Sequence, residues 1–220
     1  MINIKKNRVA PKGFSLNYVV YRIMRPILKL NYKLYKYRNK NTPWLAQESI
    51  EFLKVNLNKT MNGLEYGSGF STTFLAERSK SVVSIEHNKE WYNLINLMLK
   101  EREIDTVQYI FSGENDPINK SLEEILKNAP IHGDVNLKEN YSAYIDQVNH
   151  FEDEYFDYII IDGRARVETF MASYPKLKKG GFIILDNAER PRYAILHEFM
   201  KNHNKIYHTT GLTDTVIWYK

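Results

Sequence analysis

The chain has 220 residues, of which 43% are hydrophobic and 26% are charged, and it contains no cysteine. These values exclude a globally disordered chain, a disulfide scaffold, a thiolate metal site and a cysteine nucleophile. The net charge of +5 is distributed unevenly. Residues 1–40 hold eleven of the 31 Lys and Arg and none of the 26 Asp and Glu, which leaves the rest of the chain with a net charge of −6.

The basic N-terminal segment does not resemble a targeting sequence. Residues 1–12 are polar and lack the apolar core of a secretory signal, and no stretch of the chain is apolar over the length of a membrane span. We therefore expect a cytoplasmic protein. The basic charge of residues 1–40 adds the alternative of a peripheral position at an anionic membrane.

Apolar residues recur at helical spacing between residues 16 and 28, with basic residues between them. The pattern predicts an amphipathic helix, which Pro26 should kink. Such a helix either docks on the body with its basic face in solvent, or forms an arm that lies on an anionic membrane or binds a polyanion. We divide the chain into a basic helical N-terminal arm, residues 1–41, and a domain, residues 42–220.

From residue 42 onward the predicted elements alternate. Thr42 and Pro43 are typical of a helix start, and a helix is predicted at 44–57. Strands are predicted at 63–66, 81–86, 107–111, 156–161 and 180–185, and helices at 71–78, 89–103, 166–177 and 189–202. Two close strands, 205–209 and 215–219, predict an antiparallel hairpin. The pattern indicates an α/β fold with a Rossmann-like, doubly wound and mostly parallel sheet.

One segment interrupts this alternation. Residues 113–154 contain two predicted helices, 122–128 and 141–150, joined by a polar stretch. A connection of this length in a compact domain is usually functional. We expect residues 113–154 to form a lid-like insertion that faces the substrate.

A short glycine motif lies between the first predicted strand and the helix after it. Gly67 and Gly69 allow a tight turn and close approach to a ligand, and the following helix start offers free N–H groups. Glu86 ends the next strand, about 20 residues later, where an acid can accept both hydroxyls of a ribose. The acid before the glycines, Glu65, suits a ligand that bears a sulfonium and an ammonium group rather than a pyrophosphate.

Together, segments 64–72, 84–88, 155–163 and 177–187 resemble the successive motifs of class I S-adenosylmethionine-dependent methyltransferases. The resemblance runs from about residue 44 to residue 220. It implies S-adenosyl-L-methionine as cofactor, Ser71 at its carboxylate and Glu86 at its ribose. It also implies that Gly67, Ser68 and Gly69 line the methionine part, and that Ser112 and Gly113 lie near the adenine.

A partial resemblance to metal-dependent O-methyltransferases concerns the ends of the fourth and fifth predicted strands. It implies that Asp162, Asp186 and Asn187 hold a divalent cation, and two carboxylates with an amide oxygen suit Mg²⁺. The alternative is that Asp162 only contacts cofactor or substrate while Asp186 and Asn187 cap the next helix. The sequence departs from that family because arginines, Arg164 and Arg166, follow Asp162 where a lysine base is expected.

Four arginines follow the same two strands: Arg164, Arg166, Arg190 and Arg192. They favour an acceptor that carries carboxylate or phosphate, although ion pairs with the acidic body are the alternative. We expect O-methylation of a small or glycan-like, anionic acceptor, with Asp162 and Arg166 as catalytic residues. Two rival hypotheses are a nucleic-acid methyltransferase, which we rank below a small-molecule or glycan acceptor, and a non-catalytic binding protein that keeps the fold.

Overall fold

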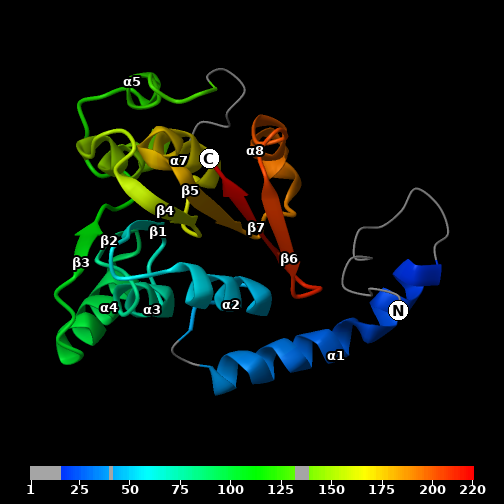
Figure 1. Ribbon diagram of the computed structural model, residues 1–220. Coiled ribbons are helices and arrows are strands. Elements are labelled where there is room, and N and C mark those ends of the chain that lie inside the picture. The colour runs from blue at the N-terminus through cyan, green and yellow to red at the C-terminus, as the bar shows by residue number, and fades with distance from the viewer. Residues whose placement is uncertain (1–15, 40–41, 132–138) are drawn as a thin grey trace.

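Figure 1 shows a computed structural model of the chain, in which residues 16–39, 42–131 and 139–220 are described. Seven strands form one sheet in the order β3-β2-β1-β4-β5-β7-β6. The strands are β1 (Asn62–Tyr66), β2 (Ser81–Glu86), β3 (Val107–Phe111), β4 (Phe156–Ile161), β5 (Leu177–Asp186), β6 (Lys205–Thr209) and β7 (Asp214–Tyr219).

The sheet confirms the predicted fold class. β1 pairs in parallel with both β2 and β4, β2 with β3, and β4 with β5, whereas β7 is antiparallel to β5 and to β6. The strand order reverses between β1 and β4, and such a switch point opens a crevice at the carboxyl edge of the sheet. The loops after β1, β2, β4 and β5 therefore define where a ligand is expected.

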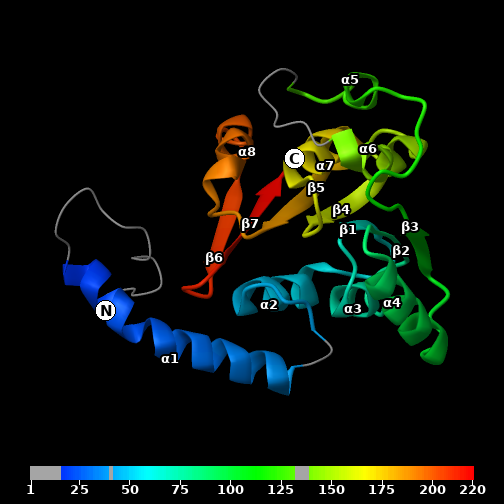
Figure 2. The ribbon, with the colours of Figure 1, turned by 180° about the vertical axis from the view of Figure 1, so that it is seen from behind.

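Helices cover both faces of the sheet (Figures 1 and 2). α2, α3 and α4 lie on one face, and α6, α7 and α8 lie on the other. The helices are α1 (Leu16–Arg38), α2 (Gln47–Asn56), α3 (Phe70–Ala76), α4 (Lys89–Glu101), α5 (Leu122–Ile125), α6 (Ser142–Asp146), α7 (Arg166–Ser173) and α8 (Ala194–Phe199), with 3-10 turns η2 (Glu139–Tyr141), η3 (Gln147–His150), η4 (Tyr174–Lys176) and η5 (Pro191–Tyr193).

The central strands are buried on both faces because successive side chains point to opposite sides. In β4, Tyr158 and Ile160 pack into the cluster under α2 and α3, whereas Ile159 and Ile161 pack into the cluster under α6, α7 and α8. Burying a side chain of this size contributes roughly 1.5 to 3 kcal/mol. Two cores thus hold the sheet rigidly and fix the loops at its carboxyl edge.

Part of the predicted lid-like insertion packs into the core. Tyr144, Ile145 and Val148 are fully buried in the main cluster, and the Tyr66 hydroxyl donates to the Ile145 carbonyl at 2.9 Å. That the insertion acts as a lid stays a prediction. Residues 132–138, in its polar stretch, lie outside the described residues.

In the N-terminal arm, the described residues form one helix, α1, that begins at Leu16 and continues through Pro26 to Arg38. The expected helix start at Thr42 is wrong: the Thr42 hydroxyl donates to the Asn39 carbonyl at 2.9 Å, and α2 begins only at Gln47. Thr42 closes the end of α1 instead. In the described ranges, no helix combines the length and hydropathy that crossing a bilayer requires.

Candidate functional site

The loop after β1 is built on a glycine that no other residue could replace without strain. Gly67 has φ +92°, and a Cβ there would lie 2.6 Å from the Gly163 nitrogen in the loop after β4. A Cβ at Gly163 would in turn lie 2.1 Å from the Tyr144 hydroxyl. The backbones of the two loops are therefore in close contact, which only glycine permits at these positions. A cleft lies beside them.

Glu86, at the end of β2, organises one wall of this cleft. Its carboxylate accepts hydrogen bonds from the Ser68 N–H at 2.9 Å, the Ser68 hydroxyl at 2.8 Å and the backbone N–H groups of His87 and Asn88 at 2.9 and 2.8 Å. Although burial opposes ionisation, the hydrogen bonds from His87, Asn88 and Ser68 hold the pKa of Glu86 below its usual value. Glu86 is thus a fixed anion, as a hydroxyl-binding acid requires.

Trp91 lines the same wall, and two further aromatic side chains, Tyr109 and Trp44, lie close to it. The Trp91 indole N–H donates to the Ser68 carbonyl at 2.7 Å, and the hydroxyls of Tyr109 and Ser68 are 2.7 Å apart. The Trp44 ring lies 6.5 Å from the Trp91 ring. Trp91 is the third residue of α4 and follows Glu86 closely, so an aromatic residue soon after the ribose-binding acid was the available signal.

Glu65 lies at the base of the glycine loop, and its predicted contact with a cofactor stays a prediction. Its side chain is fully buried and accepts hydrogen bonds from the hydroxyls of Thr72 and Ser84, both at 2.6 Å. Thr72 in turn accepts from the Gly69 N–H at 3.0 Å. Glu65 therefore supports the glycine loop from below. Burial raises its pKa to about 7 against these hydrogen bonds.

The other predicted cofactor residues lie close to this loop. Ser71 sits at the second position of α3, and the Ser112 N–H donates to the Glu86 carbonyl at 2.9 Å. The Gly113 N–H is held by the Asp116 carboxylate at 2.5 Å. The cleft formed by the described residues is not lined by Ser71, Ser112 or Gly113. Their contacts with a cofactor therefore stay a prediction.

Asp162, Arg166 and Asp186 form a cluster at the ends of β4 and β5. Arg166 donates to the Asp162 carboxylate at 2.6 Å, to the Gly163 carbonyl at 3.0 Å and to the Asp186 carbonyl, and its guanidinium is 3.9 Å from the Asp186 carboxylate. Burial raises the pKa of both carboxyl groups, and the Asp162 charge helps to raise that of Asp186 to about 7. The two acids therefore share one guanidinium.

This cluster does not fit the predicted Mg²⁺ site. The Arg166 guanidinium lies where a cation would bridge Asp162 and Asp186, and the Asn187 amide oxygen accepts from Arg190 at 2.6 Å. No group of three or more His, Cys, Asp or Glu that could hold a metal ion occurs in residues 16–39, 42–131 and 139–220. In this arrangement an arginine supplies the positive charge at the strand ends.

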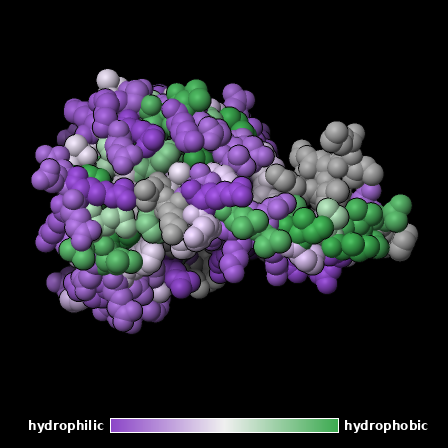
Figure 3. Space-filling model, turned by 90° about the horizontal axis from the view of Figure 1, so that it is seen from below, coloured by the Kyte–Doolittle hydropathy of each residue, from purple (hydrophilic) through white to green (hydrophobic). Residues whose placement is uncertain are grey.

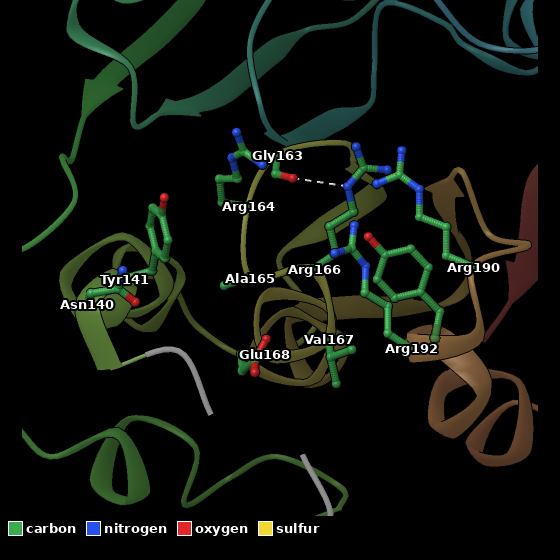
Figure 4. Close-up of a pocket in the computed structure, with 11 residues that line it drawn as sticks. Asn140, Tyr141, Gly163, Arg164, Ala165, Arg166, Val167, Glu168, Arg190 and Arg192 are labelled. Atoms are coloured by element: carbon green, nitrogen blue, oxygen red, sulfur yellow. Dashed lines mark hydrogen bonds between the residues drawn. The ribbon is translucent and has the colours of Figure 1, made fainter. Parts of the chain in front are cut away.

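The predicted arginines do converge. A cavity of about 250 Å³ lies next to the cleft, with Tyr141, Arg164, Arg166, Arg190 and Arg192 in its lining. Figure 4 shows Arg166, Arg190 and Arg192 reaching toward one another on one side, with Tyr141 on the other. We call this the arginine cavity. Glu168 lines the same hollow, and Arg166 is paired with Asp162 and Asp186. Arg164, Arg190 and Arg192 therefore supply the excess positive charge that favours anions.

The cleft beside Gly67, which we call the cofactor cleft, opens into the arginine cavity. Its lining comprises Gly67, Ser68, Glu86, His87, Trp91, Asp162, Gly163, Arg164, Arg166 and Arg190. Gly163, Arg164, Arg166 and Arg190 line both hollows. Two ligands bound in them would thus lie side by side.

Both loops that carry the arginines hold strained backbone. Ala165 has φ +44° and Asn187 has φ +53°, which is the left-handed region that non-glycine residues rarely adopt. Each such residue costs of order 1 to 3 kcal/mol and persists where the surrounding structure enforces it, often at functional sites. Arg166 directly follows Ala165, and Arg190 lies three residues after Asn187.

The sequence matches no family model and no curated protein. Solved structures share its fold. An rRNA methylase from Streptococcus thermophilus has a TM-score of 0.54 at 15% identity, over 79% of this chain and 94% of its own. A protein provisionally assigned as a methyltransferase from Streptococcus mutans, in complex with SAH, has a TM-score of 0.55 at 15% identity, over 79% and 96%.

A protein provisionally assigned as a caffeoyl-CoA O-methyltransferase from Staphylococcus aureus is also similar. Its TM-score is 0.55 at 15% identity, over 92% of this chain and 97% of its own. At this identity the likeness concerns the fold and not the substrate. The chain therefore has the Rossmann-like fold of class I methyltransferases.

Proposed function

We propose that this protein is a methyltransferase that uses S-adenosyl-L-methionine to methylate an oxygen of a small or glycan-like, anionic acceptor. The observation that supports it best is the junction of two hollows. A cofactor cleft with a rigid glycine loop and a fixed acid opens directly into an arginine cavity, and four residues line both. A methyl donor and an anionic acceptor could thus be held in contact, and positioning of this kind supplies much of the rate of a transfer reaction.

The cofactor cleft offers the groups that such a donor needs. Gly67 and Gly69 allow close backbone approach, and the Glu86 carboxylate would accept the ribose hydroxyls. Trp91 adds an aromatic wall. When bound, the cofactor supplies an electrophilic methyl group. That the Streptococcus mutans protein is in complex with SAH supports the same choice of ligand.

Asp162 is the acidic residue best placed to orient the acceptor. Of the two carboxylates that line the cleft, Glu86 is assigned to the ribose, whereas Asp162 lies beside Gly163 and Arg166, which also line the arginine cavity. Its carboxylate would accept the hydrogen bond of the acceptor hydroxyl, and Arg166 keeps that carboxylate in place at 2.6 Å. Arg166 is then a positioning residue with a positive charge near the reacting oxygen.

The acceptor is expected to carry a carboxylate or a phosphate. Arg164, Arg190 and Arg192 face the arginine cavity, and guanidinium groups bind both anions with paired hydrogen bonds. A nucleic-acid substrate is the second candidate, because phosphates would meet the same arginines and an rRNA methylase is among the structures with this fold. The cavity volume of about 250 Å³ favours a small acceptor group over a duplex.

The test is transfer of a labelled methyl group from S-adenosylmethionine to a panel of acceptors: glucuronate, glucose 6-phosphate, glucose and an RNA oligonucleotide. We expect methylation of an anionic sugar, none of glucose, and at least about a hundredfold slower transfer by Asp162→Asn. EDTA should leave the rate unchanged because Arg166 occupies the place between the two acids. Methylation of RNA alone would replace the proposed acceptor, and cofactor binding without any transfer would favour the non-catalytic binding protein.

A further inference from the structure

α1 carries a stripe of apolar side chains that the described residues leave exposed. Seven exposed hydrophobic residues occupy this stripe: Leu16, Val19, Ile23, Ile27, Leu30, Leu34 and Tyr37. At 3.6 residues per turn they fall within about 80° of the helix circumference. Ile23 is 69% exposed and Leu30 is 58% exposed, values that a core-facing helix would not leave. We call these residues the α1 stripe.

Basic side chains run beside the α1 stripe along the whole helix. Arg22, Arg25, Lys29 and Lys33 are exposed and lie on one flank of it by helical spacing. No Asp or Glu occurs in residues 1–40. An apolar stripe flanked only by positive charge is the pattern of a helix that lies in the interface of an anionic membrane.

The α1 stripe faces away from the body. Tyr21 and Tyr32 hold the opposite side of the helix, with hydroxyls that donate to the Gly211 and Trp44 carbonyls, both at 3.0 Å. Figure 3 shows the hydrophobic side chains of α1 as a band on the arm beyond a mostly hydrophilic body. A flat surface could therefore cover the stripe without meeting the body first.

α1 is also fixed relative to the functional site. Lys36 lies over the Trp44 ring at 4.1 Å, and Trp44 is next to Trp91 of the cofactor cleft. Burial, with the carboxylates of Asp186 and Asp162, raises the pKa of Tyr32 to about 12, so the carboxyl-terminal half of α1 lies near the site. A surface bound by the stripe would be presented to the site at a defined orientation.

We propose that the α1 stripe and its basic flank dock on the surface of an anionic lipid bilayer, with α1 parallel to the membrane plane. The helix is about 33 Å long at 1.5 Å per residue, so its apolar side chains would enter the acyl boundary while the basic flank meets lipid phosphates. This proposal stands on α1 alone and does not depend on the methyl-transfer reaction.

A second copy of the chain fits the α1 stripe less well. Two α1 helices packed along their stripes would bring basic flanks together with no acidic partner at any flanking position. Like charges at those positions oppose helix pairing, whereas opposite charges set it. Charge complementarity therefore selects an anionic surface as the occupant.

The experiment is co-flotation of the full-length protein with vesicles. We expect binding to phosphatidylcholine vesicles that contain phosphatidylglycerol, little binding to phosphatidylcholine alone, and weaker binding as salt rises. Replacing Ile23 and Leu30 together by Gln should weaken binding about tenfold or more, because both side chains lose their burial in the lipid. Replacing Lys29 and Lys33 by Gln should weaken it about 10- to 30-fold.

The matched controls remove similar groups from the body. Val55→Gln replaces an 83% exposed apolar residue on α2, and Lys179→Gln replaces a lysine whose side chain is 86% exposed. Both should bind vesicles as the unchanged protein does, and thermal unfolding should show that all variants fold. The proposal would be overturned if the Ile23 and Leu30 variant bound vesicles as well as the unchanged protein, or if the unchanged protein bound neither kind of vesicle. It would also be overturned if light scattering showed a dimer that this variant abolishes.

Discussion

The two halves of the carboxyl edge of the sheet are built in opposite ways. In the half formed by the loops after β1 and β2, Glu86 and Ser68 satisfy one another and the backbone around them. In the half formed by the loops after β4 and β5, arginines outnumber the acids that face them. The first half is a closed hydrogen-bonded network, which suits one cofactor of fixed shape. The second is an excess of positive charge, which selects a class of acceptor.

The largest expected effect comes from a substitution that disrupts the loop after β1. Gly67→Ala introduces a Cβ 2.6 Å from the Gly163 nitrogen at φ +92°, so one loop must move. We expect loss of cofactor binding and about 3 kcal/mol or more of lost stability, measured by calorimetry and urea unfolding. Gly180→Ala is the matched control, because φ is +80° there but no atom lies within 4 Å. It should cost only about 1 kcal/mol.

A second test uses Arg192 to distinguish acceptor binding from cofactor binding, because Arg192 lines the arginine cavity but not the cofactor cleft. Arg192→Gln should raise KM for an anionic acceptor about tenfold and leave the affinity for S-adenosylhomocysteine unchanged. Steady-state kinetics and calorimetry measure the two quantities. Lys201→Gln removes a positive charge from an exposed ion pair and should change neither. Equal loss of both affinities by Arg192→Gln would mean that the halves are one site.

A third effect is a dependence of stability on pH. Burial raises the pKa of Glu65 to about 7, so between about pH 4.5 and pH 7 the folded chain holds a proton that the unfolded chain has lost. The free energy of unfolding contributed by this group therefore falls as pH rises through that window, by up to about 3 kcal/mol.

Glu65→Gln cannot titrate and should lose this part of the pH dependence. Urea unfolding of both proteins at about pH 5 and about pH 8 measures it, and the titration of Asp186 is common to both and cancels. A pH dependence that is unchanged in the variant would show that Glu65 ionises normally within the fold.

The same contrast explains what the sequence could predict. Strands β2, β3, β4 and β6 begin and end where periodicity placed them, since each is a β-branched or apolar run between polar turns. Gly67 was recognisable because the turn after β1 requires a glycine, and Glu86 because it ends the next strand about 20 residues later. The conformation of the glycine loop depends on residues that are close in sequence, so the local sequence could predict it.

What the sequence could not predict depends on contacts between distant segments. Glu65 lies below the loop because Thr72 and Ser84 meet it there, and Arg166 fills the expected cation position because two strand ends converge. The burial of Tyr144 in the supposed lid follows from packing on the sheet. Ser84 is 19 residues from Glu65, and Asp186 is 20 residues from Arg166.

The central claim is that the cofactor cleft binds S-adenosylmethionine through Glu86. The most direct test is calorimetric titration of S-adenosylhomocysteine into the full-length protein and into Glu86→Gln, a change of nearly equal shape that removes the charge. We expect binding by the unchanged protein and at least about a tenfold loss in the variant, with both proteins folded by thermal unfolding. No binding by a folded, unchanged protein, or equal binding by the variant, would contradict the claim.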